Sequence, residues 1–313
     1  MLWVVLILLG VLLLVVLASY LCYRRVFSVP KQSRESLFEI PDTEQYTPYA
    51  QKVGQMIRSA LNIPYEPVTV SSYDGTKLFG KCYFADARAP WMIMFHGYRS
   101  GAERDFCGGL KFGIDRGFNV LLVDQRAHGK SKGKCLTFGI RERYDCLSWV
   151  RYVLSRAGEH TQIVLYGMSM GAASVLMATA LGLPKQVVGI VADCGYSSPS
   201  AIIKKVIRDR HLPLFPTYAF VRLGGILFGG FDLASASAEK AMDTCSVPVL
   251  FIHGEDDRFV PCDMGRENFR RCRSAGKVLL TVPGAGHGMS YMADKNAYLT
   301  AVSDFLEKTV TYP

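Results

Sequence analysis

A serine lies at the centre of the run Gly167–Gly171, which reads G-M-S-M-G and follows the apolar stretch Ile163–Tyr166. The small and apolar residues Ala172–Leu176 come next, so the pattern predicts a strand, a sharp turn and a helix, with Ser169 at the apex of the turn. Glycines two residues to either side of the serine would let the strand and the helix approach closely. This pattern is typical of a nucleophile elbow and predicts that Ser169 attacks carbonyl carbon atoms.

A serine hydroxyl is a weak nucleophile at neutral pH, so it needs a histidine base, and the histidine needs a carboxylate that orients it. The most suitable base is His287, because it lies in the glycine-rich segment Gly284–Gly288 between the last predicted strand and the last predicted helix. His160 and His211 have the context of surface residues, and His253 ends a predicted strand. We therefore predict His287 as the base.

The acid has several candidates. Glu255, Asp256 and Asp257 are successive residues after the predicted strand that ends near His253, and their spacing does not choose among them. Asp193 follows another predicted strand and is a further alternative, although a buried structural carboxylate is the more ordinary interpretation there. Each position comes after Ser169 and before His287, the chain order expected of such a site.

Two backbone N–H donors are needed to stabilise the negative charge that develops on the substrate oxygen. One is expected at Met170, directly after the nucleophile, where the dipole of the predicted helix also favours negative charge. The second is expected from the loop His96–Ser100, which follows the apolar run Trp91–Phe95.

The elements that would position these residues form an alternating pattern. Residues Val68–Tyr73 and Leu78–Phe84 flank an Asp-Gly turn and predict an antiparallel hairpin. Short continuous apolar runs then alternate with helical patterns, which is typical of a parallel sheet covered on both faces. The further predicted strands are Trp91–Phe95, Val120–Val123, Ile163–Tyr166, Val187–Ala192, Val249–Ile252 and Val278–Leu280. The predicted fold class is α/β, with eight strands in the arrangement of an α/β-hydrolase.

The catalytic domain is expected to span residues 46–313, after a polar linker at 26–45 that contains Pro30 and Pro41. Residues 199–242, between the sixth and seventh strands, are too many for a simple crossover and predict a cap over the active site. Within them, Ile202–Arg210 is basic and amphipathic. One hypothesis is that it contacts anionic lipid; the alternative is an apolar face on the core with solvated charges.

The N-terminal residues 1–25 predict a transmembrane anchor. Leu2–Cys22 is an uncharged run of about 21 residues, the length that a helix needs to cross a bilayer. A cleaved signal peptide, cut near Val16–Ala18, is the alternative, but no Lys or Arg precedes the run. The nearest basic residues, which all follow the run, are Arg24, Arg25, Lys31 and Arg34. By the positive-inside rule, this charge asymmetry predicts a cell-membrane protein whose domain lies in the cytoplasm.

The composition excludes several other classes of protein. The nine cysteines show no paired spacing, which argues against a disulfide framework and against a zinc site and favours a reducing compartment. The net charge of +9 comes from Lys and Arg residues dispersed along the chain, without a recognised nucleic-acid module. We therefore expect no nucleic-acid partner, no metal and no organic cofactor.

Three further motifs resemble the α/β-hydrolase superfamily. His253–Pro261 resembles the H-G-x-x-D-x-x-V-P segment in which the fifth position is the catalytic acid, which implies Asp257, with Asp256 as the second choice. The loop that begins with His96 resembles the H-G-x loop whose third residue donates to the oxyanion, which implies the N–H of Tyr98. In that loop the histidine orders the chain and is not a base.

The third motif, Asp124–Ser131, resembles D-x-R-G-H-G-x-S, with Ala127 where the family usually has glycine. The resemblance implies a hydrogen-bonded structural turn without a catalytic role. Altogether the resemblance covers about residues 62–308. Within the superfamily, the chain is similar to the bacterial branch of membrane-anchored esterases and S33-type serine aminopeptidases.

The resulting expectation is a serine hydrolase that cleaves carboxylic esters, either small-molecule or lipid-like, through an acyl-enzyme. A peptidase or amidase of the S33/S9-like type, with Asp232 or Glu239 in the cap binding a substrate amine, is the first alternative. A catalytically silent, membrane-anchored binding protein is the second. An intact set of Ser169, His287 and Asp257 argues against the second.

Overall fold

A computed structural model of the chain describes residues 1–31, 33 and 35–311. Arg34, one of the basic residues behind the predicted orientation, lies outside the described residues. Eight strands form one sheet in the order β1-β2-β4-β3-β5-β6-β7-β8. The strands are β1 (Glu66–Ser71), β2 (Lys77–Tyr83), β3 (Trp91–Phe95), β4 (Asn119–Val123), β5 (Ile163–Met168), β6 (Val187–Asp193), β7 (Val249–Gly254) and β8 (Val278–Val282).

The sheet is mostly parallel, as predicted. β1 pairs antiparallel with β2, and β2 pairs antiparallel with β4, whereas the pairings from β4 through β3 to β8 are all parallel. The first strand begins and ends two residues earlier than predicted. Pairing sets these limits, because Glu66 lies opposite Cys82 and Ser71 opposite Lys77, before the turn at Gly75.

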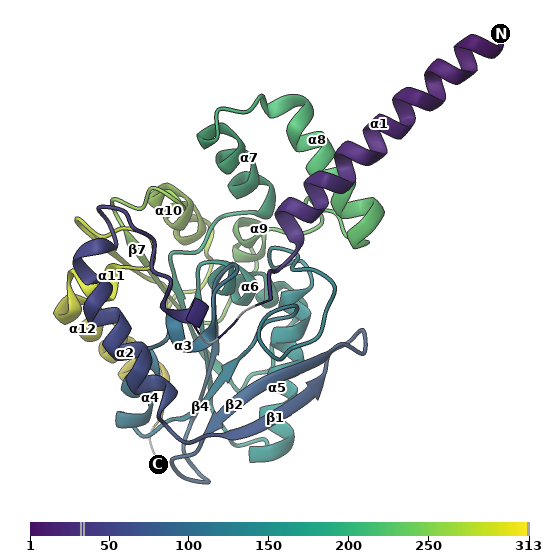
Figure 1. The fold of residues 1–313 in the computed structure, drawn as a ribbon. Coiled ribbons are helices and arrows are strands. Elements are labelled where there is room, and N and C mark those ends of the chain that lie inside the picture. The colour runs from purple at the N-terminus through teal and green to yellow at the C-terminus, as the bar shows by residue number, and fades with distance from the viewer. Residues whose placement is uncertain (32, 34, 312–313) are drawn as a thin grey trace.

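Helices cover both faces of the sheet (Figure 1). All five residues of β3 are buried; Ile93 and Phe95 belong to one hydrophobic cluster, and Met92 and Met94 belong to the other. The first cluster includes α5 (Glu142–Ala157) and α6 (Met170–Ala178), and the second includes α4 (Gly109–Asp115) and α12 (Lys295–Thr309). A strand buried on both faces needs apolar residues at every position, which explains the unbroken apolar runs.

Further helices and 3-10 turns connect these elements. They are α2 (Ala50–Leu61), α3 (Ala102–Asp105), α10 (Cys262–Arg271), α11 (Ser290–Ala293) and the 3-10 turns Glu35–Phe38, Thr47–Tyr49 and Thr179–Leu181. All nine cysteines are free thiols.

Between β6 and β7 the chain forms the cap helices α7 (Pro199–Asp209), α8 (Leu214–Gly224) and α9 (Ala238–Met242), with a π-helical turn at Gly225–Gly229. On α7, Ile202, Ile203 and Ile207 are buried. The apolar face of the basic amphipathic segment therefore packs inside the protein.

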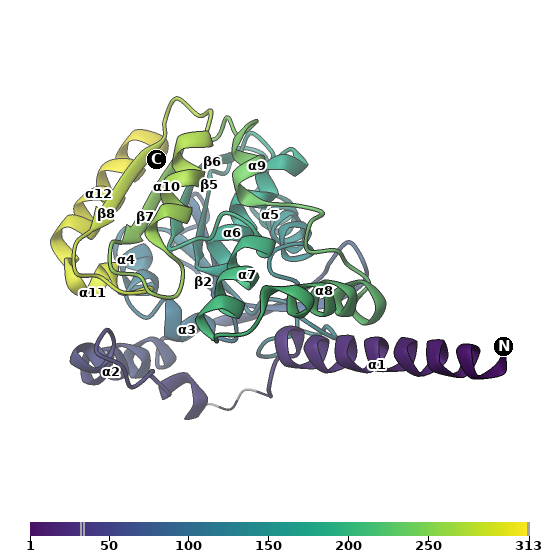
Figure 2. The ribbon, with the colours of Figure 1, turned by 90° about the horizontal axis from the view of Figure 1, so that it is seen from above.

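Helix α1 (Leu2–Phe27) projects from the domain and lies beside α8 at its C-terminal end (Figures 1 and 2). Its N-terminal part is apolar and exposed, whereas Tyr23 and Phe27 are buried. With a mean hydropathy of 3.1 over an 18-residue window, α1 is long and apolar enough to cross a membrane. It is the candidate for a membrane anchor.

The segment 26–45, interpreted as a linker, begins with the last two residues of α1 and contacts the domain where the structure describes it. The carbonyl oxygen of Phe27 accepts a hydrogen bond from the N–H of Leu136, at 3.0 Å. Further along, the side-chain amide of Gln45 donates to the carbonyl oxygen of Asp256. The segment therefore contacts the domain near both of its ends.

Candidate active site

Ser169 lies at the apex of the sharp turn between β5 and α6. Its backbone has φ 54° and ψ −114°, a strained conformation for a residue with a side chain. The flanking glycines are required sterically, because a Cβ atom on Gly171 would lie 1.8 Å from the carbonyl oxygen of Phe95. A Cβ atom on Gly167 would lie 2.5 Å from the backbone of Ala172. The predicted strand-turn-helix arrangement is therefore present.

The structure brings the serine together with the predicted base and one of the predicted acids. The Oγ atom of Ser169 lies 2.9 Å from Nε2 of His287, and Nδ1 of His287 lies 2.7 Å from Oδ2 of Asp257. The Oδ1 atom of Asp257 accepts hydrogen bonds from the N–H groups of Phe259 (2.9 Å) and Val260 (2.8 Å). A proton can therefore pass from the serine to an imidazole whose other nitrogen is held by a fixed carboxylate.

Burial and charge set the protonation of this pair. Burial opposes ionisation of Asp257, but the neighbouring His287 and His253 outweigh burial and hold the pKa of the carboxyl well below its ordinary value. Burial likewise opposes protonation of His287, but Asp257 outweighs it and raises the pKa of the imidazole above its ordinary 6.5. The carboxylate is therefore charged at neutral pH, and it stabilises the imidazolium.

The other candidate acids lie elsewhere. Glu255 and Asp256 are exposed. Asp193 is buried, and its Oδ2 atom accepts a hydrogen bond from the hydroxyl of Tyr298 at 2.8 Å, while burial raises its pKa to about 6. Its backbone carbonyl accepts from the N–H of Ser169 at 2.8 Å. Asp193 thus supports the elbow through its backbone.

Of the two predicted oxyanion donors, Met170 directly follows Ser169, and Tyr98 lines the same cavities as Ser169. Within the described residues, the N–H groups of Tyr98 and Met170 have no hydrogen-bond acceptor, and Met170 is the first residue of α6. His96 orders the loop before Tyr98: its Nε2 accepts from the N–H of Gln125 (3.1 Å), which leaves Nδ1 to donate to the carbonyl oxygen of Gly97 (2.8 Å). Both N–H groups are thus free to bind an oxyanion.

A role that sequence reasoning missed belongs to His128. Its Nε2 accepts from the N–H of Arg99 at 3.1 Å, next to Tyr98, and its Nδ1 donates to the carbonyl oxygen of Arg126 at 2.9 Å. Burial lowers the pKa of His128 to about 3, so the ring is neutral and able to accept. The turn at 124–131 therefore holds the loop His96–Ser100, hereafter the oxyanion loop, in place. The histidine within the motif was the sequence signal that could have indicated this role.

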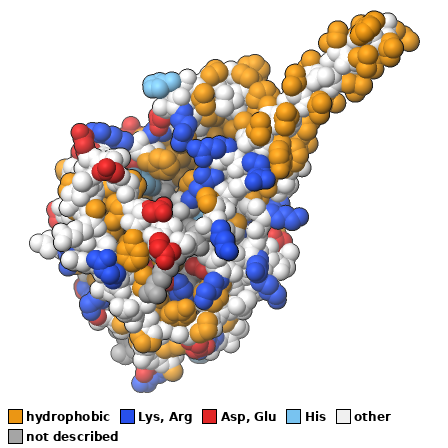
Figure 3. Space-filling view, in the orientation of Figure 1, with side chains coloured by type: hydrophobic (Ala, Val, Ile, Leu, Met, Phe, Trp, Pro, Cys, Tyr) orange, Lys and Arg blue, Asp and Glu red, His pale blue; other side chains and the backbone are white. Residues whose placement is uncertain are grey.

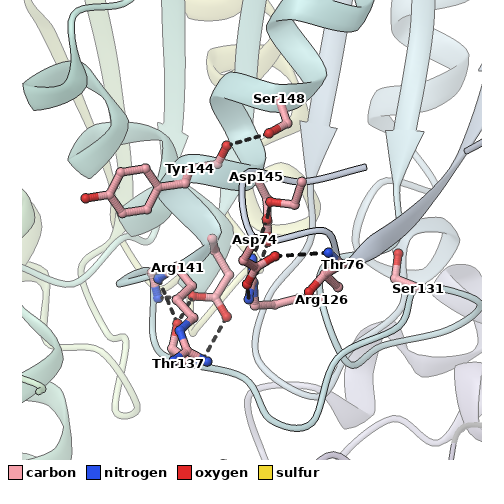
Figure 4. Close-up of polar contacts among 12 residues, drawn as sticks. Asp74, Thr76, Arg126, Ser131, Thr137, Arg141, Tyr144, Asp145 and Ser148 are labelled. Atoms are coloured by element: carbon pink, nitrogen blue, oxygen red, sulfur yellow. Dashed lines mark hydrogen bonds and ion pairs between the residues drawn. The ribbon is translucent and has the colours of Figure 1, made fainter. Parts of the chain in front are cut away.

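Arg126 anchors that turn to the rest of the domain (Figure 4). Its guanidinium donates two hydrogen bonds of 2.6 Å to the carboxylate of Asp145 on α5, and a third of 3.0 Å to Asp74 in the hairpin turn. The arginine is 2% exposed. The next residue, Ala127, has φ 64°, the left-handed conformation in which glycine is usual.

His253 is a second side chain whose place the sequence did not reveal. It is buried, its Nε2 donates to the carbonyl oxygen of Val260 at 2.8 Å, and the same atom lies 3.3 Å from Oδ2 of Asp257. It therefore supports both the loop and the charge of the catalytic carboxylate. The available signal was its place as the first residue of the motif His253–Pro261, four residues before Asp257.

Two cavities meet at Ser169. The smaller, of about 220 Å³, is bordered by α2, α3 and the His287 loop. The larger, of about 420 Å³, is bordered by the end of α1, by α7 and by α8. No cluster of three or more His, Cys, Asp or Glu residues that could hold a metal ion occurs in the described part of the chain.

Comparisons with known proteins identify the family of the chain. Residues 92–298 match the model of the alpha/beta hydrolase family. The uncharacterized protein YqkD of Bacillus subtilis is 28% identical over 195 residues, which cover 62% of this chain and 64% of that protein. Protein bem46 of Schizosaccharomyces pombe is 26% identical over 225 residues, 69% of this chain and 67% of that protein.

Among solved structures, the esterase Pf2001 of Pyrococcus furiosus is 25% identical, with a TM-score of 0.63, and the match covers 81% of this chain and 96% of that one. The family match spans β3 to α12, the elements that carry Ser169, Asp257 and His287. The chain therefore belongs to the alpha/beta hydrolase family.

Proposed function

We propose that this protein is a serine hydrolase that cleaves carboxylic esters through an acyl-enzyme. The observation that carries the proposal is the continuous hydrogen-bonded series from Ser169 through His287 to Asp257. The similarity to esterase Pf2001 supports an ester as substrate. The polar atoms of the site supply a nucleophile, a base and an acid, so the chemistry needs no further group.

In the first step, the Oγ atom of Ser169 forms a bond to the ester carbonyl carbon, and its proton passes to Nε2 of His287. The carbonyl oxygen becomes an oxyanion, which the N–H groups of Tyr98 and Met170 bind. The carbonyl then re-forms, the bond to the alcohol oxygen breaks, and His287 gives its proton to the departing alcohol. The acyl group stays on Ser169.

In the second step, water replaces the alcohol. Water gives a proton to Nε2 of His287 while its oxygen forms a bond to the acyl carbon, and the oxyanion is bound as before. The bond to Ser169 then breaks, and the serine oxygen takes the proton back. The products are a carboxylic acid and the free enzyme.

The amidase alternative, of the S33/S9-like type, uses the same three residues but needs a group that binds a substrate amine. Asp232 and Glu239 do not line either cavity at Ser169. Asp232 is already paired with Arg222 through contacts of 2.8 and 2.7 Å. These observations favour a carboxylesterase-like activity.

We further propose that α1 anchors the protein in the cell membrane and that the catalytic domain faces the cytoplasm. The support for an anchor is the length and exposed apolar surface of α1. The support for the orientation is the pair Arg24 and Arg25, which directly follows the apolar run on the side of the domain.

The test is covalent labelling by a fluorophosphonate, which reacts with activated serines, together with hydrolysis of p-nitrophenyl butyrate. The native chain should be labelled and active, and Ser169→Ala should lose labelling and about 10⁶-fold in kcat. Ser148→Ala on α5, where the hydroxyl bonds only to the carbonyl oxygen of Tyr144, is the control and should keep both properties. Folded native protein that is neither labelled nor active would overturn the proposal and favour the binding-protein alternative.

A further inference from the structure

The larger cavity at Ser169, hereafter the α1–cap cavity, has a wall made by the last turns of α1. Cys22, Arg25 and Val26 of α1 line it on one side. The opposite side consists of apolar side chains from the cap, namely Ile202, Ile203, Val206, Ile207, Leu212 and Val221. At about 420 Å³ the cavity falls in the range of roughly 300–1,000 Å³ that is usual for small-molecule sites.

The two cavities differ in whether His287, the proposed base, lines them. Ser169 borders both, but His287 lines only the smaller one. In the proposed reaction His287 must protonate the leaving oxygen, so the alcohol extends into the smaller cavity. The acyl chain then extends the other way, into the apolar α1–cap cavity.

The wall that α1 provides is firmly attached. A Cβ atom on Gly224 of α8 would lie 2.4 Å from the carbonyl oxygen of Ser19, so only glycine allows this close approach of the two helices. The buried ring of Phe27 packs edge-on against Phe231, with ring centroids 5.0 Å apart. The hydroxyl of Tyr98 also donates to the carbonyl oxygen of Val26, at 3.0 Å. The end of α1 is thus joined to the oxyanion loop itself.

The cavity adjoins an apolar surface that continues onto α1. The cap exposes Leu212, Phe215, Ile226, Leu227 and Phe228, and the ring centroid of Phe228 lies 5.1 Å from that of Tyr20 on α1. Figure 3 shows hydrophobic side chains along α1 and over the neighbouring cap. Three arginines and no carboxylate line the cavity, a charge that suits an anionic membrane surface: Arg25, Arg99 and Arg210.

We propose that the last turns of α1 form part of the acyl-binding site, so that the enzyme takes esters of long-chain fatty acids directly from the bilayer in which α1 is anchored. This inference rests on the proposed esterase function. It gives α1 a role in substrate selection in addition to anchoring.

The experiment compares two adjacent substitutions on α1 in the full chain, reconstituted in lipid nanodiscs. Cys22→Trp places an indole in the cavity, whereas Leu21→Trp, at a residue 58% exposed, places the same bulk outside. Because each methylene lost from an apolar pocket costs roughly tenfold or more in kcat/KM, Cys22→Trp should reduce kcat/KM for p-nitrophenyl laurate at least about tenfold relative to p-nitrophenyl butyrate. Leu21→Trp should leave that ratio unchanged.

Val206→Trp fills the same cavity from the cap and should produce the same loss for laurate, so the test does not depend on one variant folding. Fluorophosphonate labelling of Ser169 identifies variants with an intact site. If labelled Cys22→Trp and Val206→Trp keep the native laurate-to-butyrate ratio, the inference is wrong. Failure of the esterase function itself would look different, because the native chain would then show no labelling that depends on Ser169.

Discussion

At the scale of single residues, the proposed reaction makes His287 the group that sets how activity depends on pH. The base works only when its imidazole is neutral, and Asp257 raises its pKa above 6.5. We therefore expect kcat/KM for p-nitrophenyl butyrate to fall as the pH decreases, with a midpoint above 6.5, because protonated His287 cannot accept the serine proton.

Asp257→Asn is the matched variant for this pH profile. It removes the charge that favours the imidazolium, so the midpoint should move to lower pH, and activity should fall about 10⁴-fold because the imidazole loses its orienting carboxylate. Asp256→Asn, at the exposed neighbour, should change neither quantity. A native midpoint at or below 6.5 would contradict the assignment of Asp257.

Site residues that stand within a local sequence pattern could be predicted from the sequence. Ser169 followed from its flanking glycines and His287 from its glycine-rich loop, whereas the choice of Asp257 depended on resemblance. His128 could not be assigned, because its partner, the N–H of Arg99, lies in another loop. A sequence pattern does not encode which loops meet.

At the scale of elements, the turn at 124–131 connects the hairpin, α5 and the oxyanion loop. Its anchor is Arg126, whose partner Asp145 is also buried. Arg126→Met should lower the free energy of unfolding by about 3–5 kcal/mol, because it leaves the carboxylate of Asp145 buried without its counter-ion. Fluorophosphonate labelling of Ser169 should weaken as well, since His128 in the same turn holds the oxyanion loop.

The measurement is urea unfolding of the full chain, with native protein and variants in one non-denaturing detergent. Arg156→Met is the control: Arg156 pairs with Glu66 at 2.9 Å, but both residues are exposed to solvent, so its loss should cost less than about 1 kcal/mol. Equal costs for the two substitutions would show that the turn is not anchored through Arg126.

At the scale of the whole molecule, α1 and the catalytic domain form a connected unit, with the domain expected on the cytoplasmic side. Protease added to intact cells should therefore leave the domain uncut, and it should degrade the domain after the cells are permeabilised. The physical reason is that Arg24 and Arg25 resist translocation across the bilayer.

A variant with several lysines added ahead of Leu2 is the control for orientation, because it removes the charge asymmetry and should expose part of the protein to external protease. The protein should stay in the membrane fraction at high salt, because an apolar helix and not surface charge holds it there. Cleavage of the native domain in intact cells would reverse the orientation.

The sequence by itself determined the α/β fold, the apolar N-terminal helix and the nucleophile with its base, because strand runs, helix lengths and the elbow are local patterns. Only the tertiary structure decided that the end of α1 packs on the cap and on the oxyanion loop, and that Asp257 with His253 behind it faces His287. These contacts join residues far apart in the chain, and packing, which depends on the shapes of both partners, selects them. The cavity beside α1 arises in the same way, since neither α1 nor the cap encloses it alone.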